Sequence, residues 1–292
     1  MERIAGVIGL GIMGGAMSAN LVASGWRIHG YDPDPAARNA AKAAGVEVHD
    51  SLETLVHAAP VIMTSLPTPG ALHATAEAIA ATGAPNRVVA EVSTMALEDK
   101  LAFEAVLGQA GHTALDCPIS GTGSQAKTRD LVLYCSGDTE AIGRLQPFFG
   151  AFARAAHDLG AYGNGSRMKY VANLLVAIHN VASAEAMVLG MKAGLDPHQV
   201  VALICSGAGT SRVFELRAPM MATASYEPAT MKVSVWQKDM AIIGEFATAL
   251  GVATPLLSAC IPVYASAMAL GHGPHDTAAV CDVLERMAAI ER

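Results

Sequence analysis

The stretch Gly9-Leu10-Gly11-Ile12-Met13-Gly14 decides the fold of this 292-residue chain. It lies between an apolar run, Arg3–Ile8, and a helical pattern, Met13–Ala23, so its glycines stand at a strand-to-helix turn. In such a turn Gly9 makes the tight bend, Gly11 lets a pyrophosphate approach the backbone, and Gly14 allows close helix packing. The N–H groups at the helix start then face the phosphates. The pattern predicts a dinucleotide-binding βαβ unit; a glycine turn without a ligand is the alternative.

A carboxylate follows the second predicted strand. Asp32 comes directly after Trp26–Tyr31, 18 residues beyond Gly14. A carboxylate at this place accepts hydrogen bonds from both ribose hydroxyls and repels a 2′-phosphate, which favours NAD over NADP as the cofactor. Arg38 lies in the next helical segment and leaves NADP possible, although an exposed helical arginine is the simpler interpretation.

Short apolar runs and helical patterns alternate through the first half of the chain. This alternation is typical of βαβ units and predicts an α/β fold with a Rossmann-type, doubly wound, mostly parallel sheet. The predicted strands are Arg3–Ile8, Trp26–Tyr31, Val46–His49, Val61–Ser65, Val88–Glu91, Thr113–Asp116 and Leu131–Ser136. The predicted helices between them are Met13–Ala23, Asp34–Ala44, Ala71–Ala81, Leu97–Gln109 and Thr139–Phe149.

The hydrophobic period changes near the Tyr162–Gly165 turn. Every long periodic segment after this turn is helical. The predicted helices are Asn164–Ala193, Pro197–Cys205, Thr230–Leu250, Thr254–Leu270 and Asp276–Ile290. We therefore predict an NAD(P)-binding domain over residues 1–162 and an all-helical C-terminal domain over residues 163–292, which begins with a long interdomain helix.

Composition excludes several classes of protein. Hydrophobic residues make up 52% and charged residues 15% of the chain, which excludes wholesale disorder. The formal charge of −7, without a basic block, and the 5% aromatic content exclude a nucleic-acid partner. The five cysteines include no Cys-x-x-Cys pair, which indicates a reducing compartment and no metal site. His272 and His275 lie in a Gly-Pro loop without a visible third ligand.

One segment is long and apolar enough to suggest a membrane span. Val171–Met191 carries Asn173, His179, Asn180 and Glu185, which a lipid-facing helix tolerates only at a high energetic cost. We therefore expect a cytoplasmic protein without a membrane partner. The Ala- and Met-rich helical half has few charges, which predicts a homodimer or homotetramer.

Four motifs, in order along nearly the whole chain, resemble the β-hydroxyacid dehydrogenase family. This family includes 3-hydroxyisobutyrate dehydrogenase and tartronate semialdehyde reductase and is related to 6-phosphogluconate dehydrogenase. The motifs are Gly9–Gly14 with Met17 and Asn20-Leu21, Asp116–Gly123, Gly165 with Lys169 and Asn173, and Lys238-Asp239.

The resemblance implies roles for individual residues. Lys169 and Asn173 would be catalytic, and Ser120, Gly121 and Thr122 would bind the substrate. The cofactor-binding set would comprise Gly9, Leu10, Gly11, Ile12, Met13, Gly14, Asp32, Leu66, Pro67, Thr94 and Lys238. The chain departs from the family pattern at Thr122, where the family has a glycine, and at Ala172, where it has an asparagine. These departures put the identity of the substrate in doubt.

The position of Lys169 on its predicted helix also indicates a role in proton transfer. It lies at i and Asn173 at i+4, so both share one face of the long helix, close to its start. The helix dipole and burial in a cleft both favour the neutral amine, which is the form that accepts a proton. The apolar residues Met168, Val171, Leu175 and Ile178 predict a neighbouring buried stripe. A surface lysine beside such a stripe is the alternative.

These observations predict an NAD(P)-dependent oxidoreductase that acts on a small molecule. It would interconvert a small β-hydroxyacid and its semialdehyde or keto acid by hydride transfer, with Lys169 as the general acid/base. An imine reductase-like enzyme of the same superfamily is one alternative, although such enzymes generally lack the helix lysine. A non-catalytic NAD-binding sensor or scaffold is the other.

Overall fold

A computed structural model describes residues 2–291 of the chain. The chain divides into two compact units, Met1–Lys169 and Tyr170–Arg292. The division falls inside one helix, α8 (Asn164–Lys192), whereas the boundary predicted from the sequence lies just before that helix. The N-terminal unit is α/β and the C-terminal unit is helical, as the sequence predicts.

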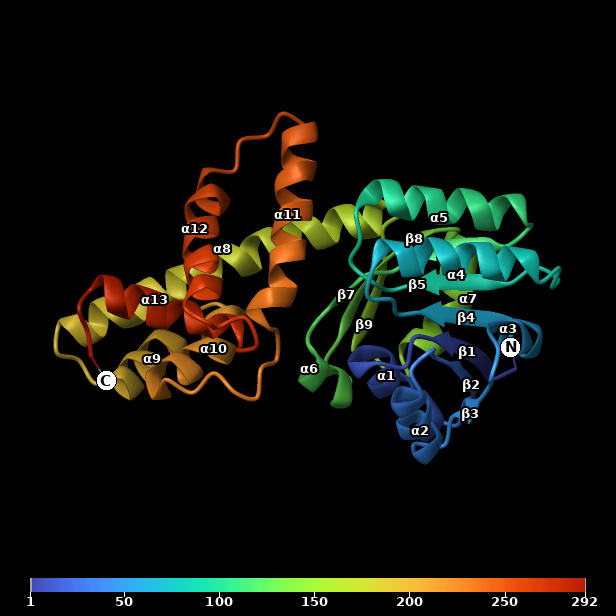
Figure 1. The fold of residues 1–292 in the computed structure, drawn as a ribbon, viewed down its shortest axis with the longest axis horizontal. Coiled ribbons are helices and arrows are strands. Elements are labelled where there is room, and N and C mark those ends of the chain that lie inside the picture. The colour runs from blue at the N-terminus through green and yellow to red at the C-terminus, as the bar shows by residue number, and fades with distance from the viewer. Residues whose placement is uncertain (1, 292) are drawn as a thin grey trace. The chain divides into compact units, whose positions relative to one another are not determined.

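A sheet with nine strands among the described residues forms the N-terminal unit (Figure 1). The order along it is β3-β2-β1-β4-β5-β6-β8-β7, with β9 beside β8. The first six strands are parallel, and β8 runs antiparallel to β6 and β7. The strands are β1 (Ile4–Ile8), β2 (Arg27–Tyr31), β3 (Glu47–Val48), β4 (Val61–Thr64), β5 (Val88–Glu91), β6 (Thr113–Asp116), β7 (Ile119–Ser120), β8 (Val132–Gly137) and β9 (Ala155–Asp158). The strand order reverses beside β1, and doubly wound sheets bind ligands at such a switch point.

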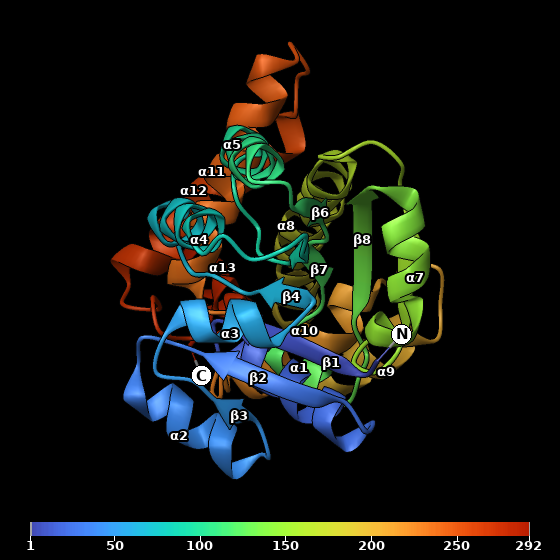
Figure 2. The same ribbon diagram turned by 90° about the vertical axis from the view of Figure 1, so that its right-hand side faces the viewer.

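Helices cover both faces of this sheet (Figures 1 and 2). They are α1 (Ile12–Ala23), α2 (Pro35–Ala43), α3 (Leu52–Ala58), α4 (Pro69–Ala81), α5 (Leu97–Gln109), α6 (Gly123–Lys127) and α7 (Thr139–Phe149). Side-chain oxygens cap four of them, because Asp34, Ser51, Thr68 and Asp138 each accept a backbone N–H of the first turn. The sequence analysis did not predict α3, α6, β7 or β9.

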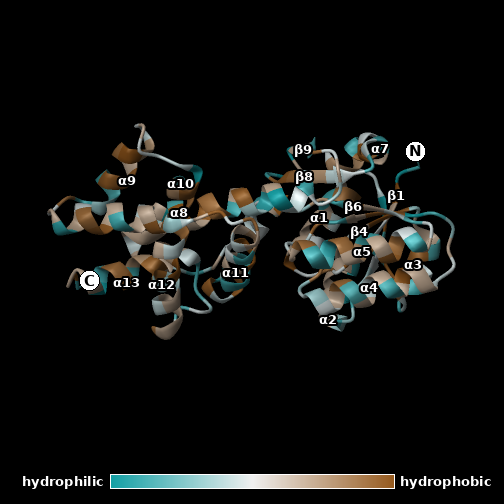
Figure 3. Ribbon diagram, turned by 90° about the horizontal axis from the view of Figure 1, so that it is seen from above, coloured by the Kyte–Doolittle hydropathy of each residue, from teal (hydrophilic) through white to brown (hydrophobic). Residues whose placement is uncertain are grey.

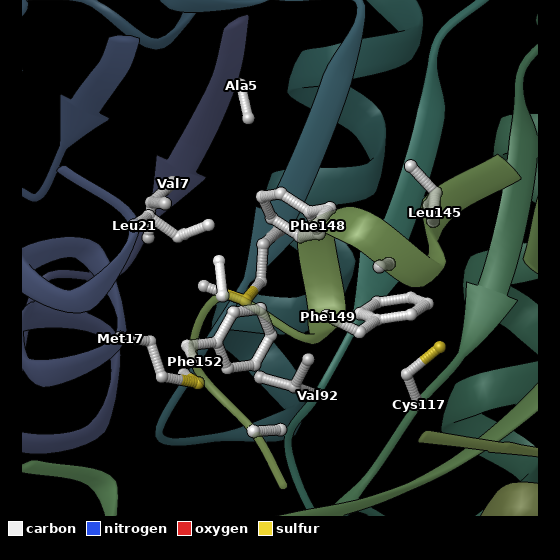
Figure 4. Close-up of a cluster of buried hydrophobic side chains, with 14 of the residues drawn as sticks. Ala5, Val7, Met17, Leu21, Val92, Cys117, Leu145, Phe148, Phe149 and Phe152 are labelled. Atoms are coloured by element: carbon white, nitrogen blue, oxygen red, sulfur yellow. The ribbon is translucent and has the colours of Figure 1, made fainter. Parts of the chain in front are cut away.

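Two apolar clusters hold the helices to the sheet. On the side of α1, α2 and α7, Met17 and Leu21 meet Phe148, Phe149 and Phe152 (Figure 4). The ring of Trp26 packs edge-on against Phe148 with the centroids 5.1 Å apart. The second cluster joins α3, α4 and α5 to the opposite face. Burial on both faces explains why the central strands are almost wholly apolar.

A buried ionic cluster fixes the start of α8. The ammonium group of Lys100 on α5 contacts Glu91 at the end of β5 and lies 3.1 Å from Asp116 Oδ1 at the end of β6, and none of the three side chains is exposed. Asp116 in turn accepts the Ser166 N–H at 2.7 Å and the Ser166 hydroxyl at 2.9 Å. A Cβ on Gly165 would lie 2.6 Å from the Asp116 carbonyl oxygen, so only glycine allows this approach.

The C-terminal unit is built on the remainder of α8. Its other helices are α9 (Pro197–Cys205), α10 (Arg212–Thr223), α11 (Val233–Ala249), α12 (Pro255–Ala269), the 3₁₀ turn η1 (Thr277–Ala279) and α13 (Val280–Met287). The Asn180 amide on α8 donates to the Tyr264 hydroxyl and to the Thr277 carbonyl. The structure adds α10, which was not predicted, and replaces the helix predicted over Asp276–Ile290 by η1 and the shorter α13.

The predicted buried stripe on α8 is wrong. Met168, Val171 and Leu175 are 38%, 51% and 49% exposed, and Ile178 is half-buried. By contrast, Lys169 and Asn173 are 8% and 4% exposed. Apolar and polar segments alternate along the helix (Figure 3), and its hydrogen-bonding partners draw the polar face inward. Among the described residues, α8 is the helix that would be long and apolar enough to cross a membrane, and helices in the core of globular proteins meet the same criterion.

Replacement of Lys100 tests the ionic cluster. Lys100→Met leaves two buried carboxylates without their cation, so we expect the free energy of unfolding to fall by about 3–5 kcal/mol. Urea denaturation followed by circular dichroism measures this change, with Lys42→Met on the exposed side of α2 as the control. An equal, small effect of the two substitutions would contradict the role given to Lys100.

Candidate active site

The glycine turn after β1 is tightly packed at Gly9 and Gly14. Gly9 has φ +90°, and a Cβ there would lie 2.1 Å from the Ser65 carbonyl oxygen. A Cβ on Gly14 would lie 1.8 Å from the Gly9 carbonyl oxygen. A Cβ on Gly11 would meet nothing within 4 Å, so this glycine borders open space. The turn is packed on its inner side and open at Gly11, as the approach of a pyrophosphate requires.

The start of α1 also fits a diphosphate. Gly11 occupies the N-cap position and offers no side chain to the N–H groups of the first turn, and no acidic residue lies in that turn. Backbone N–H groups at a helix start bind phosphate oxygens, and the helix dipole favours the negative charge. Of the predicted cofactor set, Ile12 is the most exposed hydrophobic side chain and stands in this first turn.

Asp32 ties the glycine turn to β2. Its Oδ2 accepts the Leu10 N–H at 2.7 Å, and its Oδ1 accepts the Asp34 N–H at 2.8 Å. Each carboxylate oxygen keeps a second lone pair, so the group can still accept hydrogen bonds from ribose hydroxyls. The Arg38 guanidinium donates to the Asp32 carbonyl oxygen at 2.8 Å. A cation is therefore bound to the backbone of the residue on whose carboxylate the cofactor prediction rests.

Two loops at the same edge of the sheet carry Leu66, Pro67 and Thr94. The Leu66 N–H donates to the Ser93 hydroxyl at 2.7 Å, and the Ser93 N–H donates to Glu91 Oε1 at 2.9 Å. Leu66 and Thr94 are half-buried, and Pro67 is exposed. The carboxylate that contacts Lys100 thus also holds the loop after β5, and through it the loop after β4.

The Ser120–Thr122 segment leaves β7 and enters α6. Gly121 has φ +140°, and a Cβ there would lie 2.5 Å from Leu131 Cδ2. The Thr122 N–H donates to Gln125 Oε1 at 3.1 Å, and its hydroxyl lies 2.9 Å from that of Ser124. The backbone N–H of Thr122 is therefore already bonded within the segment. Ser120 and Thr122 are half-buried.

The substrate segment lies against the glycine turn. A Cβ on Gly123 would lie 2.6 Å from Ile12 Cγ2, and the Asn20 amide of α1 donates to the Ala126 carbonyl at 2.7 Å. The N-terminal unit thus brings the predicted substrate segment beside the predicted cofactor turn. Asp32 and the loops at Leu66 and Thr94 belong to the same carboxyl edge of the parallel strands.

Asn173 belongs to a series of polar side-chain contacts in the C-terminal unit. Its amide donates to Asp239 Oδ2 at 3.0 Å, and Asp239 Oδ1 lies 3.2 Å from Lys238 Nζ. Asp239 is buried, whereas the Lys238 side chain is 40% exposed. Asp239 was not predicted as a site residue, although it stands in the Lys238-Asp239 motif. Lys169 precedes Asn173 by one turn of α8, and both side chains are buried.

The cysteine next to Asp116 is not a nucleophile. Burial raises the pKa of the Cys117 thiol well above its usual value, and Cys135 and Asp116 raise it further. Burial and the nearby Asp116 also raise the pKa of Glu104. A thiol that keeps its proton neither attacks a carbonyl nor binds a metal readily.

Two family models together cover almost the whole chain. The NAD binding domain of 6-phosphogluconate dehydrogenase matches residues 4–163. The NAD-binding domain of NADP-dependent 3-hydroxyisobutyrate dehydrogenase matches residues 163–284. The chain belongs to the β-hydroxyacid dehydrogenase family. Among its relatives, an L-threonate dehydrogenase of Cupriavidus necator is 31% identical over 97% of this chain and 96% of its own length.

Further members of the β-hydroxyacid dehydrogenase family agree over the full length. A probable 3-hydroxyisobutyrate dehydrogenase of Mycobacterium bovis is 30% identical over 96% of this chain and 97% of its own. The solved structure of the Mycobacterium tuberculosis 3-hydroxyisobutyrate dehydrogenase with L-serine has a TM-score of 0.88, 30% identity, and coverage of 97% and 99% of the two chains. A Streptomyces aurantiacus imine reductase, at 18% identity and a TM-score of 0.66, shares only the fold.

The family assignment confirms the predicted class of activity. The chain is an NAD(P)-dependent oxidoreductase of the hydroxyacid dehydrogenase type, acting on a CH–OH group. Its two-domain fold, a Rossmann-type unit followed by a helical one, is that of its relatives. The roles predicted for individual residues, the choice between NAD and NADP, and the substrate stay predictions.

Thr122 offers a test of the substrate segment. Thr122→Gly removes a hydroxyl and a Cβ from the start of α6, so we expect KM to change more than kcat across a panel of small hydroxyacids. Steady-state kinetics measures the two constants, with Ser124→Ala as the control because it removes the hydroxyl that contacts Thr122. An unchanged substrate profile in Thr122→Gly would show that this segment does not contact the substrate.

Proposed function

We propose that this enzyme oxidises the β-hydroxyl group of a small carboxylic acid, with Lys169 as the residue that takes up the hydroxyl proton. The observation that carries the proposal is the burial of Lys169 at the start of a helix that Asp116 fixes to the sheet. A buried lysine near a helix N-terminus is biased toward the neutral amine, which can act as a base near neutral pH.

The proton and the hydride leave the substrate on different paths. The Nζ of neutral Lys169 accepts the proton of the hydroxyl group as the carbonyl forms. In the direction of reduction, its ammonium form returns the proton and polarises the carbonyl oxygen. Asn173 is held through its amide by Asp239, which leaves its carbonyl oxygen as an acceptor that can orient Lys169 or the substrate hydroxyl.

The dinucleotide would be held by the glycine turn, Asp32, the loops at Leu66, Pro67 and Thr94, and Lys238. When bound, the dinucleotide would supply the hydride acceptor for oxidation and the hydride donor for reduction. The carboxylate of Asp32 supports NAD as the preferred cofactor, because a 2′-phosphate would meet its negative charge. The neighbouring Arg38 supports a measurable activity with NADP.

The substrate class follows from the relatives and from the Ser120–Thr122 segment. The named relatives act on L-threonate and 3-hydroxyisobutyrate, and one solved relative is described with L-serine. Each of these acids has three or four carbon atoms and carries a hydroxyl group. The hydroxyls of Ser120 and Thr122 suit a polar acid of this size. The segment supports a small hydroxyacid that bears a second polar group.

We also propose that the enzyme is a cytoplasmic homodimer or homotetramer. The exposed residues Met168, Val171, Leu175 and Leu189 lie on the outer side of α8. An apolar stripe of this kind is costly in water and is usually covered by a second subunit. The five free cysteines agree with a reducing compartment.

Substitution of Lys169 tests the proposed function most directly. We expect Lys169→Ala to lower kcat by about 10²–10⁴-fold, the usual contribution of a positioned acid–base group. Lys169→Arg should fail almost as badly, because a guanidinium keeps its proton at physiological pH. Oxidation by the unmodified enzyme should rise with pH as the ammonium loses its proton. Steady-state kinetics over a pH series measures all three effects.

Arg167→Ala is the matched control for Lys169. Arg167 is exposed and lies two residues earlier on α8, and its guanidinium donates to Asn164 Oδ1 at 2.8 Å. Its replacement should leave kcat and the NAD dissociation constant nearly unchanged. Near-normal turnover by Lys169→Ala, or a loss explained wholly by weaker NAD binding, would remove Lys169 from the chemistry and favour a sensor or scaffold.

The cofactor preference depends on Asp32. Asp32→Ser removes the repulsion of a 2′-phosphate, so we expect the ratio of kcat/KM for NADP over NAD to rise by about tenfold, or about 1.4 kcal/mol. Adding Arg38→Ala should reverse most of this gain, because it removes the adjacent cation. An unmodified enzyme that already prefers NADP would show that Asp32 does not set the preference.

A further inference from the structure

Three potential metal ligands meet at the edge of the sheet. His29 on β2 pairs in register with Glu47 on β3, and His49 follows β3 directly. His29 Nδ1 lies 2.8 Å from His49 Nε2 and 3.8 Å from Glu47 Oε1. One ligand atom from each of the three residues lies within 4.8 Å of the others. Two imidazoles and one carboxylate form a donor set that suits zinc and related divalent ions.

The two histidines are held in place by the fold. His29 is 3% exposed, so the packing around β2 fixes the position of its imidazole. The His49 N–H donates to the Gly30 carbonyl at 2.9 Å, which fixes the backbone of the second ligand to β2. The proton shared by His29 Nδ1 and His49 Nε2 in their hydrogen bond must move to another ring nitrogen or be released when an ion binds both atoms.

Glu47 leaves one oxygen for an ion. The Arg27 guanidinium donates to Glu47 Oε2 at 3.0 and 2.9 Å, and Oε1 is the oxygen that faces His29. An outer partner that orients a ligating carboxylate is a common feature of metal sites. The Glu47 side chain is 49% exposed, so solvent can reach the cluster and supply the remaining ligands.

The other histidine pair of the chain lacks this convergence. His272 and His275 face each other through Nδ1 atoms 2.9 Å apart, while His272 Nε2 lies 2.9 Å from Asp282 on the other side of the ring. The two nitrogens of His272 are thus both engaged, in opposite directions. This arrangement is a hydrogen-bonded relay that joins the loop after α12 to α13.

We propose that His29, Glu47 and His49 form a binding site for a divalent transition-metal ion of the Zn²⁺ class. Two ligands at 2.0–2.1 Å in a tetrahedron lie about 3.3 Å apart, so the two imidazole nitrogens need to separate by about 0.5 Å when the ion enters. The ion joins β3, the last strand of the sheet, to β2, the strand that ends at Asp32. Binding therefore stabilises the sheet edge and does not depend on the dehydrogenase reaction.

The test uses the tag-free, metal-free full chain and Zn²⁺ alone. Isothermal titration should show one equivalent of Zn²⁺ bound, with a rise in the thermal midpoint on saturation because the ion binds the folded state. We expect His49→Ala and Glu47→Gln each to weaken binding more than tenfold and to abolish most of the thermal shift. His57→Ala, which removes an exposed histidine of nearby α3, should bind Zn²⁺ like the unmodified chain.

The role of His29 is tested by NMR on the unmodified chain, because its replacement would disturb the core. Zn²⁺ should move the ¹⁵N resonances of the His29 and His49 imidazoles together and leave those of His272 and His275 in place. The proposal is overturned if no saturable one-to-one binding occurs below roughly 100 μM free Zn²⁺. It is equally overturned if binding persists unchanged in His49→Ala and Glu47→Gln, or if the shifted resonances belong to other histidines.

Discussion

One buried cation, the ammonium group of Lys100, organises the end of the sheet at which the site is built. It lies between Glu91 and Asp116, and two carboxylates this deep in a protein would be strongly destabilising without it. Each carboxylate then holds backbone from a different segment: Glu91 binds the loop at Ser93, and Asp116 binds the first turn of α8 at Ser166. The cofactor-side loops and the helix that carries the proposed base therefore share a single electrostatic support. A change at this one position reaches both.

The close approach of helix starts to the strands of the sheet is the second constraint. It explains why glycine is needed at these positions. Gly14 and Gly165 each lie where a helix begins against the sheet, and a Cβ at either one would overlap a carbonyl oxygen. Helix starts brought this close to strand ends can present N–H groups and the first-turn side chains to a ligand at the strand ends. In α8 hydrogen-bonding partners hold the polar face inward, so that Lys169 and Asn173 are buried while apolar neighbours face outward.

Local signals in the sequence were sufficient for much of this structure, and non-local contacts account for the rest. The glycine turn, the alternation of strands and helices and the change of period are local patterns, and the fold they predict is confirmed. The short strands β7 and β9 lack an apolar run, and α6 is only five residues long, so neither periodicity nor length reveals them. The ionic cluster joins residues from three elements, and the meeting of His29 with Glu47 depends on strand pairing. The direction of the α8 stripe depends on which partners bind its polar face, which hydrophobic period alone does not specify.

The two tryptophans of the chain fall in different units, one in each. Trp26 is buried against Phe148 in the N-terminal unit, and Trp236 is buried on α11 in the C-terminal unit. Indole emission responds to the polarity around the ring, and each ring leaves an apolar environment only when its own unit opens. The protein thus carries one intrinsic optical reporter for each half. With either indole replaced by phenylalanine, the remaining emission follows a single unit, so the cooperativity between the halves becomes directly observable without an attached dye.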